Sequence, residues 1–156
     1  MRLLIASVGH KMPDWITEGY SEYAKRMPRE TRMELIEIKP EPRTTGKSTA
    51  QIMEAEATRI TGALPQSCRR IVLDERGEMV STKRLSALMQ EWMSSGQDVA
   101  FIIGGADGLS DSVKKDAHQM ISLSSCTLPH AFVRVLLAEQ LYRAYSLMHN
   151  HPYHRE

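Results

Sequence analysis

The sequence has little of what marks secreted or membrane-spanning proteins. Only two of its 156 residues are cysteine, Cys68 and Cys126, and their spacing matches neither a disulfide framework nor a metal site. The first residues, MRLLIASVGHK, contain an apolar run that is too short for a signal peptide. No run approaches the ~20 apolar residues that a membrane span needs. We therefore expect a protein of the reducing cytoplasm that does not enter the membrane.

The sequence also lacks an excess of charge of either sign. Its 20 Lys and Arg residues nearly balance its 19 Asp and Glu residues, for a net charge of +1. This excludes the global basic character of proteins that coat nucleic acid, so an RNA partner would have to bind to local patches. Residues 39–49, KPEPRTTGKST, form one such candidate. With three basic side chains and a glutamate among them, a solvated surface loop is favoured over an RNA-phosphate contact.

Short apolar runs alternate with helical patterns along the whole chain. Strands are expected at residues 2–8, 34–39, 69–74, 98–103 and 120–123. Helices are expected at residues 13–27, 48–63, 81–95, 110–118 and 132–148. A polar turn is expected at residues 75–77, after the third strand. This alternation predicts an α/β fold, a mainly parallel sheet with helices on both faces, in a single domain over residues 1–156.

Two of the predicted strands end in loops of small residues, as at the ligand slots of α/β proteins. Gly104 and Gly105 follow the fourth strand, where the absence of a Cβ lets a ligand approach the backbone. The run GGADG is neither a dinucleotide nor a Walker motif, which argues against a phosphate-binding nucleotide enzyme; a plain glycine turn suits it equally well. Residues 123–128, LSSCTL, offer polar backbone groups between leucines and suit an adenine ring. By composition alone, an ordinary strand-to-helix connector is the simpler interpretation.

The last helical pattern, residues 132–148, is apolar nearly all round, which predicts burial on most faces, partly against a second subunit. One polar stripe remains, formed by Glu139, Arg143, Ser146 and Asn150. Glu139 precedes Arg143 in the favourable order for a helix ion pair. Because an arginine between apolar flanks needs a partner, we expect a functional role for Arg143.

The C-terminal run HNHPYHRE is rich in histidine, which raises the question of a metal site. Zinc would need further ligands, and the sequence has no Cys–His cluster elsewhere to supply them, so we expect no metal. A solvated, disordered tail is the ordinary interpretation. A tail that contacts an RNA substrate is the alternative, because Tyr, His and Arg can stack on a base and hydrogen-bond to it.

Several of these segments together resemble the RlmH (YbeA) family of SPOUT-superfamily methyltransferases. They are IIGGADGLS, LSSCTLPH, VRVLLAEQLYRAYS and the terminal NHPYHRE, and VGHKMPDW and ELIEI near the N-terminus also fit. The resemblance covers essentially the whole chain. It implies an enzyme that uses S-adenosylmethionine to methylate N3 of a pseudouridine in bacterial large-subunit (23S) rRNA on the assembled ribosome. It also implies a C-terminal trefoil knot and a homodimer in which the tail of one subunit completes the other subunit's site.

The resemblance further implies which residues contact the cofactor. These are Leu73, Gly104, Leu123, Ser124, Ser125, Cys126, Thr127 and Leu128. Transfer to N3 of a uracil-like ring requires loss of the N3 proton and stabilisation of the resulting negative charge. The candidate catalytic and base-contacting residues are Arg143 and Arg155 for the charge, His154 for the proton or for orienting the base, Glu139 for positioning Arg143, and Tyr153 or His130 for stacking.

Other functions stay open at this point. In one alternative, the chain is a SPOUT methyltransferase of the same fold that acts on tRNA or on a ribose 2′-hydroxyl. In another, the chain is a non-catalytic module that binds ribosomes. The joint presence of the LSSCTL loop, Arg143 and the tail argues against such a module, which would not require all three.

Overall fold

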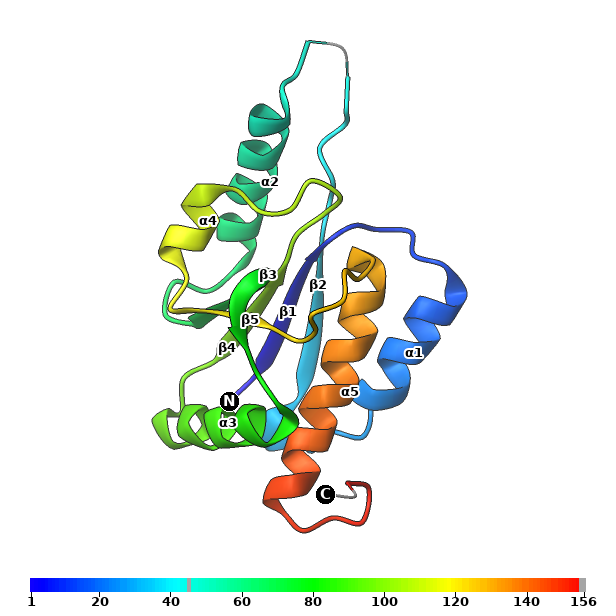
Figure 1. Cartoon of the computed structure of the whole chain (residues 1–156), viewed down its shortest axis with the longest axis vertical. Helices are drawn as coiled ribbons and strands as arrows, with labels where there is room; N and C mark the ends of the chain where they lie inside the picture. The colour runs from blue at the N-terminus through cyan, green and yellow to red at the C-terminus, as the bar shows by residue number, and fades with distance from the viewer. Residues whose placement is uncertain (45, 155–156) are drawn as a thin grey trace.

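The computed structural model describes residues 1–44 and 46–154, in which strands and helices alternate as predicted (Figure 1). The strands are β1 (Leu3–Val8), β2 (Met33–Ile38), β3 (Arg69–Met79), β4 (Val99–Ile103) and β5 (Gln119–Ser122). The helices are α1 (Asp14–Ala24), the short 3-10 helix η1 (Arg29–Thr31), α2 (Thr49–Ala63), α3 (Thr82–Ser95), α4 (Asp111–Asp116) and α5 (His130–Met148). Among the described residues, no helix has the length and apolar character needed to span a membrane.

All five strands are parallel and lie in the order β2-β1-β4-β3-β5. Alternate side chains of β1 enter two separate cores: Leu3 and Ile5 pack with α1, α3 and α5, whereas Leu4 and Ala6 pack with α2 and α4. A parallel sheet covered on both faces needs apolar side chains on both faces, and this explains the nearly continuous apolar runs of β1 and β4. The predicted sheet with helices on both faces is confirmed. The trefoil knot is not tested by the strand order and stays a prediction.

Local signals in the sequence place most helix ends. Ser48 accepts a hydrogen bond from the Gln51 N–H, and the Gln51 side chain accepts one from the Ser48 N–H, which makes a capping box at the start of α2. Ser81 and Ser110 likewise cap α3 and α4. The α1 helix ends at Ala24, earlier than the predicted residue 27, and continues as tight turns, because the residue before a proline disfavours the helical conformation.

The turn predicted at residues 75–77 is wrong, because β3 continues to Met79. Leu73 and Glu78 both align with Ile121 of β5, so the residues between them bulge out of the ladder and the strand then resumes. Gly77 permits this return, since a Cβ there would lie 2.7 Å from backbone atoms of Ile121. The polar run Glu-Arg-Gly is typical of turns, but here it forms a bulge between two stretches of β3 that both pair with β5.

We expect Gly77→Ala to lower the free energy of unfolding by about 1–3 kcal/mol, because the atoms that the new methyl group meets are backbone and give way only at a cost. Urea denaturation measures the change. The matched control is Gly62→Ala, on α2 with nothing within 4 Å of the added Cβ; it should raise stability by about 0.5–1 kcal/mol. A Gly77→Ala variant as stable as the unmodified protein would contradict the close contact between β3 and β5.

Candidate functional site

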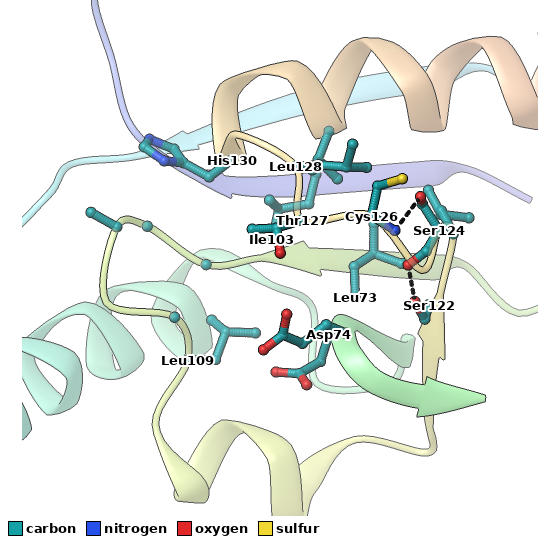
Figure 2. A pocket seen from close by; sticks show the side chains of 17 residues that line it. Leu73, Asp74, Ile103, Leu109, Ser122, Ser124, Cys126, Thr127, Leu128 and His130 are labelled. Carbon is teal, nitrogen blue, oxygen red and sulfur yellow. Dashed lines mark hydrogen bonds between the residues drawn. The ribbon is translucent and has the colours of Figure 1, made fainter. Parts of the chain in front are cut away.

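The middle of β3 and the loops that follow β4 and β5 enclose a cavity of about 300 Å³ (Figure 2). Because the strands are parallel, their carboxyl ends meet at one edge of the sheet, where ligands of open α/β proteins bind. The lining residues are Leu73, Asp74 and Glu75 of β3, Ile103 at the end of β4, Gly104, Gly105, Ala106, Gly108 and Leu109 after it, Ser122 to Ser124 and Cys126 to Leu128 around the end of β5, and His130 and Val133 of α5. We call it the loop cavity.

Close backbone packing shapes the loop after β4. A Cβ on Gly104 would lie 2.8 Å from the carbonyl carbon of Gly108. Gly108 has a φ of 82°, a conformation that favours glycine, and its N–H donates to the Gly105 carbonyl at 3.0 Å. The glycines therefore close the loop tightly and leave bare backbone beside the cavity.

The loop after β5 is held by its own serines. The Ser122 hydroxyl donates to the Ser124 carbonyl at 2.9 Å, and the Cys126 N–H donates to the Ser124 hydroxyl oxygen at 2.9 Å (Figure 2). Leu123 and Leu128 stand at the two ends of the loop and are both part of the cavity lining. The result is a cavity with apolar walls and small polar groups between them, as is usual for sites that bind small molecules.

The structure brings most of the predicted cofactor residues to this one cavity. All of them line it except Ser125, which is exposed. His130, predicted to contact the substrate base, lines it too. Asp74 was not predicted, although a carboxylate directly after the apolar run Ile71–Leu73 is a recognisable signal. It lies at the cavity (Figure 2). Its Oδ2 is 3.3 Å from Nζ of Lys114.

The other predicted site residues gather where α5 ends. The tail folds back on the helix there, and the Tyr153 hydroxyl donates to Oε1 of Glu139 at 3.0 Å. The same oxygen is 2.6 Å from Nη2 of Arg143, whose guanidinium lies over the Tyr153 ring, 4.9 Å from its centroid. Nδ1 of His154 is 3.5 Å from the Ser146 hydroxyl. We call these residues the tail cluster; Arg155, the remaining candidate, lies outside the described residues.

Within the tail cluster, Glu139 serves as a hydrogen-bond acceptor. Its second oxygen accepts from the Gln140 side chain at 2.8 Å. Burial, and then the hydrogen bond to Glu139, raise the pKa of Tyr153, so the phenol keeps its proton at neutral pH and remains the donor. Glu139 thus holds Arg143 in place in this structure, and its role in a reaction stays a prediction.

The loop cavity lies at the first turn of α5. The tail follows the other end of the helix (Figure 1). His130 and Arg143 are separated by roughly 20 Å along the helix axis, at about 1.5 Å per residue. The two groups of predicted residues therefore do not meet within a single chain.

Arg134 is a functional candidate that was not predicted. Its side chain is 2% exposed, and it donates to Oε2 of Glu37 at 3.0 Å and to the Ser7 hydroxyl at 3.1 Å. These bonds tie α5 to β1 and β2, one helical turn from His130 at the loop cavity. The available signal was a charge within an apolar run, FVRVLL, because a buried charge needs partners.

Comparison with known proteins gives consistent results. Residues 1–154 match a family model described as "Predicted SPOUT methyltransferase". The chain is 59% identical to the ribosomal RNA large subunit methyltransferase H of Ralstonia pickettii and 58% identical to that of Nitrosomonas eutropha, over 99% of each chain. Among solved structures, a probable methyltransferase from Bordetella pertussis has a TM-score of 0.54 at 16% identity, covering 92% of this chain and 94% of that one. A probable methylase family protein from Haemophilus influenzae also has a TM-score of 0.54, at 13% identity. The match covers 99% of this chain and 70% of that one. The two structures support the fold alone.

We expect Arg134→Ala to lower the free energy of unfolding by about 3–5 kcal/mol, because it opens a cavity and leaves the buried Ser7 hydroxyl without this donor. Chemical denaturation followed by circular dichroism measures the loss. The control is Arg84→Ala, a half-exposed arginine of α3 whose Nε is 3.7 Å from Glu78; its effect should stay within about 1 kcal/mol. Equal losses in the two variants would show that Arg134 does not anchor α5.

Proposed function

The chain belongs to the SPOUT methyltransferase family, among its ribosomal RNA large subunit methyltransferase H members, and we propose that it transfers a methyl group from S-adenosylmethionine to N3 of a pseudouridine in 23S rRNA. The observation that carries this proposal is the loop cavity, in which the glycine loop and the LSSCTL loop converge with β3. Because the expected substrate is the assembled ribosome, the proposal includes action in the cytoplasm.

The lining of the loop cavity fits an adenosine group. Leu123 and Leu128 offer apolar walls to the adenine ring, while the backbone near Gly104 and in the LSSCTL loop suits its polar edge. The Asp74 carboxylate is an acceptor of the kind that ribose hydroxyls need. When bound, S-adenosylmethionine supplies a methyl group that its sulfonium already activates, so the chain's task is to place the acceptor nitrogen and manage its proton.

The tail cluster suits the acceptor side of the reaction. Deprotonated N3 carries negative charge, and Arg143 is a cation held in place by Glu139 and by the ring of Tyr153. His154 is the candidate to accept the proton or to orient the base, with Arg155 as a second cation. Since this cluster lies far from the chain's own cavity, we propose a homodimer in which the tail of one copy completes the site of the other.

The surface near the loop cavity supports such a dimer. Trp15 of α1 is 58% exposed, and its ring centroid lies 6.4 Å from that of Phe132 on α5. Next to it, Val133, Val135 and Leu136 of α5 are only partly buried. An exposed apolar surface of this kind is typical of a site of protein–protein contact.

We expect cells that lack this gene to lose one N3-methylpseudouridine from 23S rRNA, as measured by mass spectrometry of rRNA nucleosides. The unmodified gene should restore the methyl group. Gly104→Leu should not, because its side chain meets the Gly108 backbone and has to displace the glycine loop that forms one wall of the cavity. Calorimetry should show that Gly104→Leu no longer binds S-adenosylhomocysteine, while Gly62→Leu, in open space on α2, binds as before. Unchanged rRNA, or a methyl group lost from tRNA or from a ribose, would refute the proposal.

A shared active site makes a further prediction, for two inactive variants expressed together. A chain without residues 153–156 should bind cofactor but fail to transfer methyl groups, and Gly104→Leu should fail to bind cofactor. Mixed dimers combine an intact cavity from one chain with an intact tail from the other, so co-expression should restore part of the activity. Purified mixed dimers without activity, or an active truncated chain, would contradict the shared site.

A further inference from the structure

A smaller cavity of about 180 Å³ adjoins the loop cavity on the side of β1 and β2. The two cavities share Gly105, Ala106 and His130 in their linings. A Cβ on Gly105 would lie 3.1 Å from Val8 and 3.7 Å from Oε1 of Glu56, so the bare glycine leaves space between them. A ligand of the loop cavity that extends past Gly105 therefore enters this smaller cavity, which we call the side cavity.

Glu56 of α2 lines the side cavity as a buried carboxylate. The residue is 7% exposed, and its Oε2 accepts a hydrogen bond from the Glu41 N–H at 3.0 Å. In residues 1–44 and 46–154, this is the carboxylate's single hydrogen-bond partner, and no cationic nitrogen lies within 4 Å of it. A buried negative charge with so little compensation is costly unless a ligand brings positive charge.

The neighbouring carboxylate of Glu41, unlike that of Glu56, is paired with basic side chains. Lys47 and Arg59 both form ion pairs with it, and the hydrogen bond from Lys47, with help from Arg59, lowers the pKa of Glu41. The charge of Glu41 is thus already balanced by the chain itself. Glu56 is left as the carboxylate of the side cavity that has a charge to offer a ligand.

Arg43 provides the opposite charge in the same lining. Its side chain is 57% exposed, and its Nη2 lies 2.6 Å from Oδ2 of Asp107. A buried carboxylate and an accessible guanidinium in one small cavity match the two charges of an amino acid, whose ammonium donates to carboxylates and whose carboxylate binds guanidinium groups.

We propose that the side cavity binds the amino acid portion of S-adenosylmethionine, with Glu56 accepting hydrogen bonds from the α-ammonium group and Arg43 binding the α-carboxylate. This inference rests on the proposed function, because it assigns the adenosine portion to the loop cavity. It makes Glu56 and Arg43 cofactor-binding residues, and it explains why a carboxylate is buried beside a glycine that keeps the passage open.

Calorimetry with three compounds tests the assignment without measuring activity. S-adenosylmethionine and S-adenosylhomocysteine carry the amino acid portion, whereas 5′-methylthioadenosine lacks it. Glu56→Gln removes the charge but keeps an acceptor for the Glu41 N–H, so the fold should persist, which thermal unfolding checks. We expect this variant to bind the first two compounds roughly tenfold to a hundredfold more weakly and methylthioadenosine unchanged. Glu54→Gln, the same change at an exposed position of α2, should alter none of the three affinities.

Each other pattern of affinities overturns the inference. Equal weakening of all three compounds would make Glu56 a structural residue, and no weakening would remove it from the site. Loss confined to S-adenosylmethionine would place Glu56 at the sulfonium. If the unmodified protein binds none of the compounds, the proposed function itself fails, and that result is distinct from the others.

The role of Arg43 is tested with a pair of variants that break the same ion pair. Arg43→Gln should weaken S-adenosylhomocysteine several-fold and leave methylthioadenosine unchanged. Asp107→Asn loses the ion pair but keeps the guanidinium, so S-adenosylhomocysteine should bind at least as well as before. The same loss in both variants would show that the ion pair acts by shaping the loop, and it would overturn the assignment of Arg43.

Discussion

The parallel direction of all five strands is the constraint on which the rest of the molecule depends. Each parallel connection has to cross a face of the sheet, so helices cover both faces, and the carboxyl ends of the strands meet at one edge. The bulge of β3 and the loops after β4 and β5 converge at that edge on the loop cavity. Neither the glycine loop nor the LSSCTL loop would form a site alone, because each supplies one wall.

Two buried charges flank this edge in different ways. Arg134 is balanced from within the chain by Glu37 and Ser7, which ties α5 to the sheet next to His130. Glu56 is held by one backbone N–H and lies in the lining of the side cavity. The charge of Arg134 is used to hold the helix, so its role is structural. The charge of Glu56 is available to a ligand, which is why a binding role is proposed for it.

The length of α5 is the reason for proposing a second copy at the site. Its first turn lines the loop cavity, whereas its second half, from Glu139 to Arg143, contacts Tyr153 of the tail. A straight helix keeps these groups apart, however the tail folds. The proposed dimer resolves this separation by pairing the cavity of one chain with the tail of another, and the exposed Trp15 beside Phe132 offers an apolar surface for contact.

The sequence by itself determined the features that depend on neighbouring residues. Alternation of apolar runs and helical patterns predicted the parallel sheet, and Ser48, Ser81 and Ser110 predicted the starts of three helices. The small-residue loops pointed to the cavity, and resemblance to a known family named the residues around it.

Tertiary structure alone decided which charges are buried. Glu54 and Glu56 look alike in the sequence, yet packing of α2 exposes one and buries the other. Arg134 meets Ser7 and Glu37 from far along the chain, and Gly77 lies close to the backbone of Ile121 only because β5 pairs with β3. Such contacts join segments that no local pattern connects, because burial and pairing are properties of the packed chain.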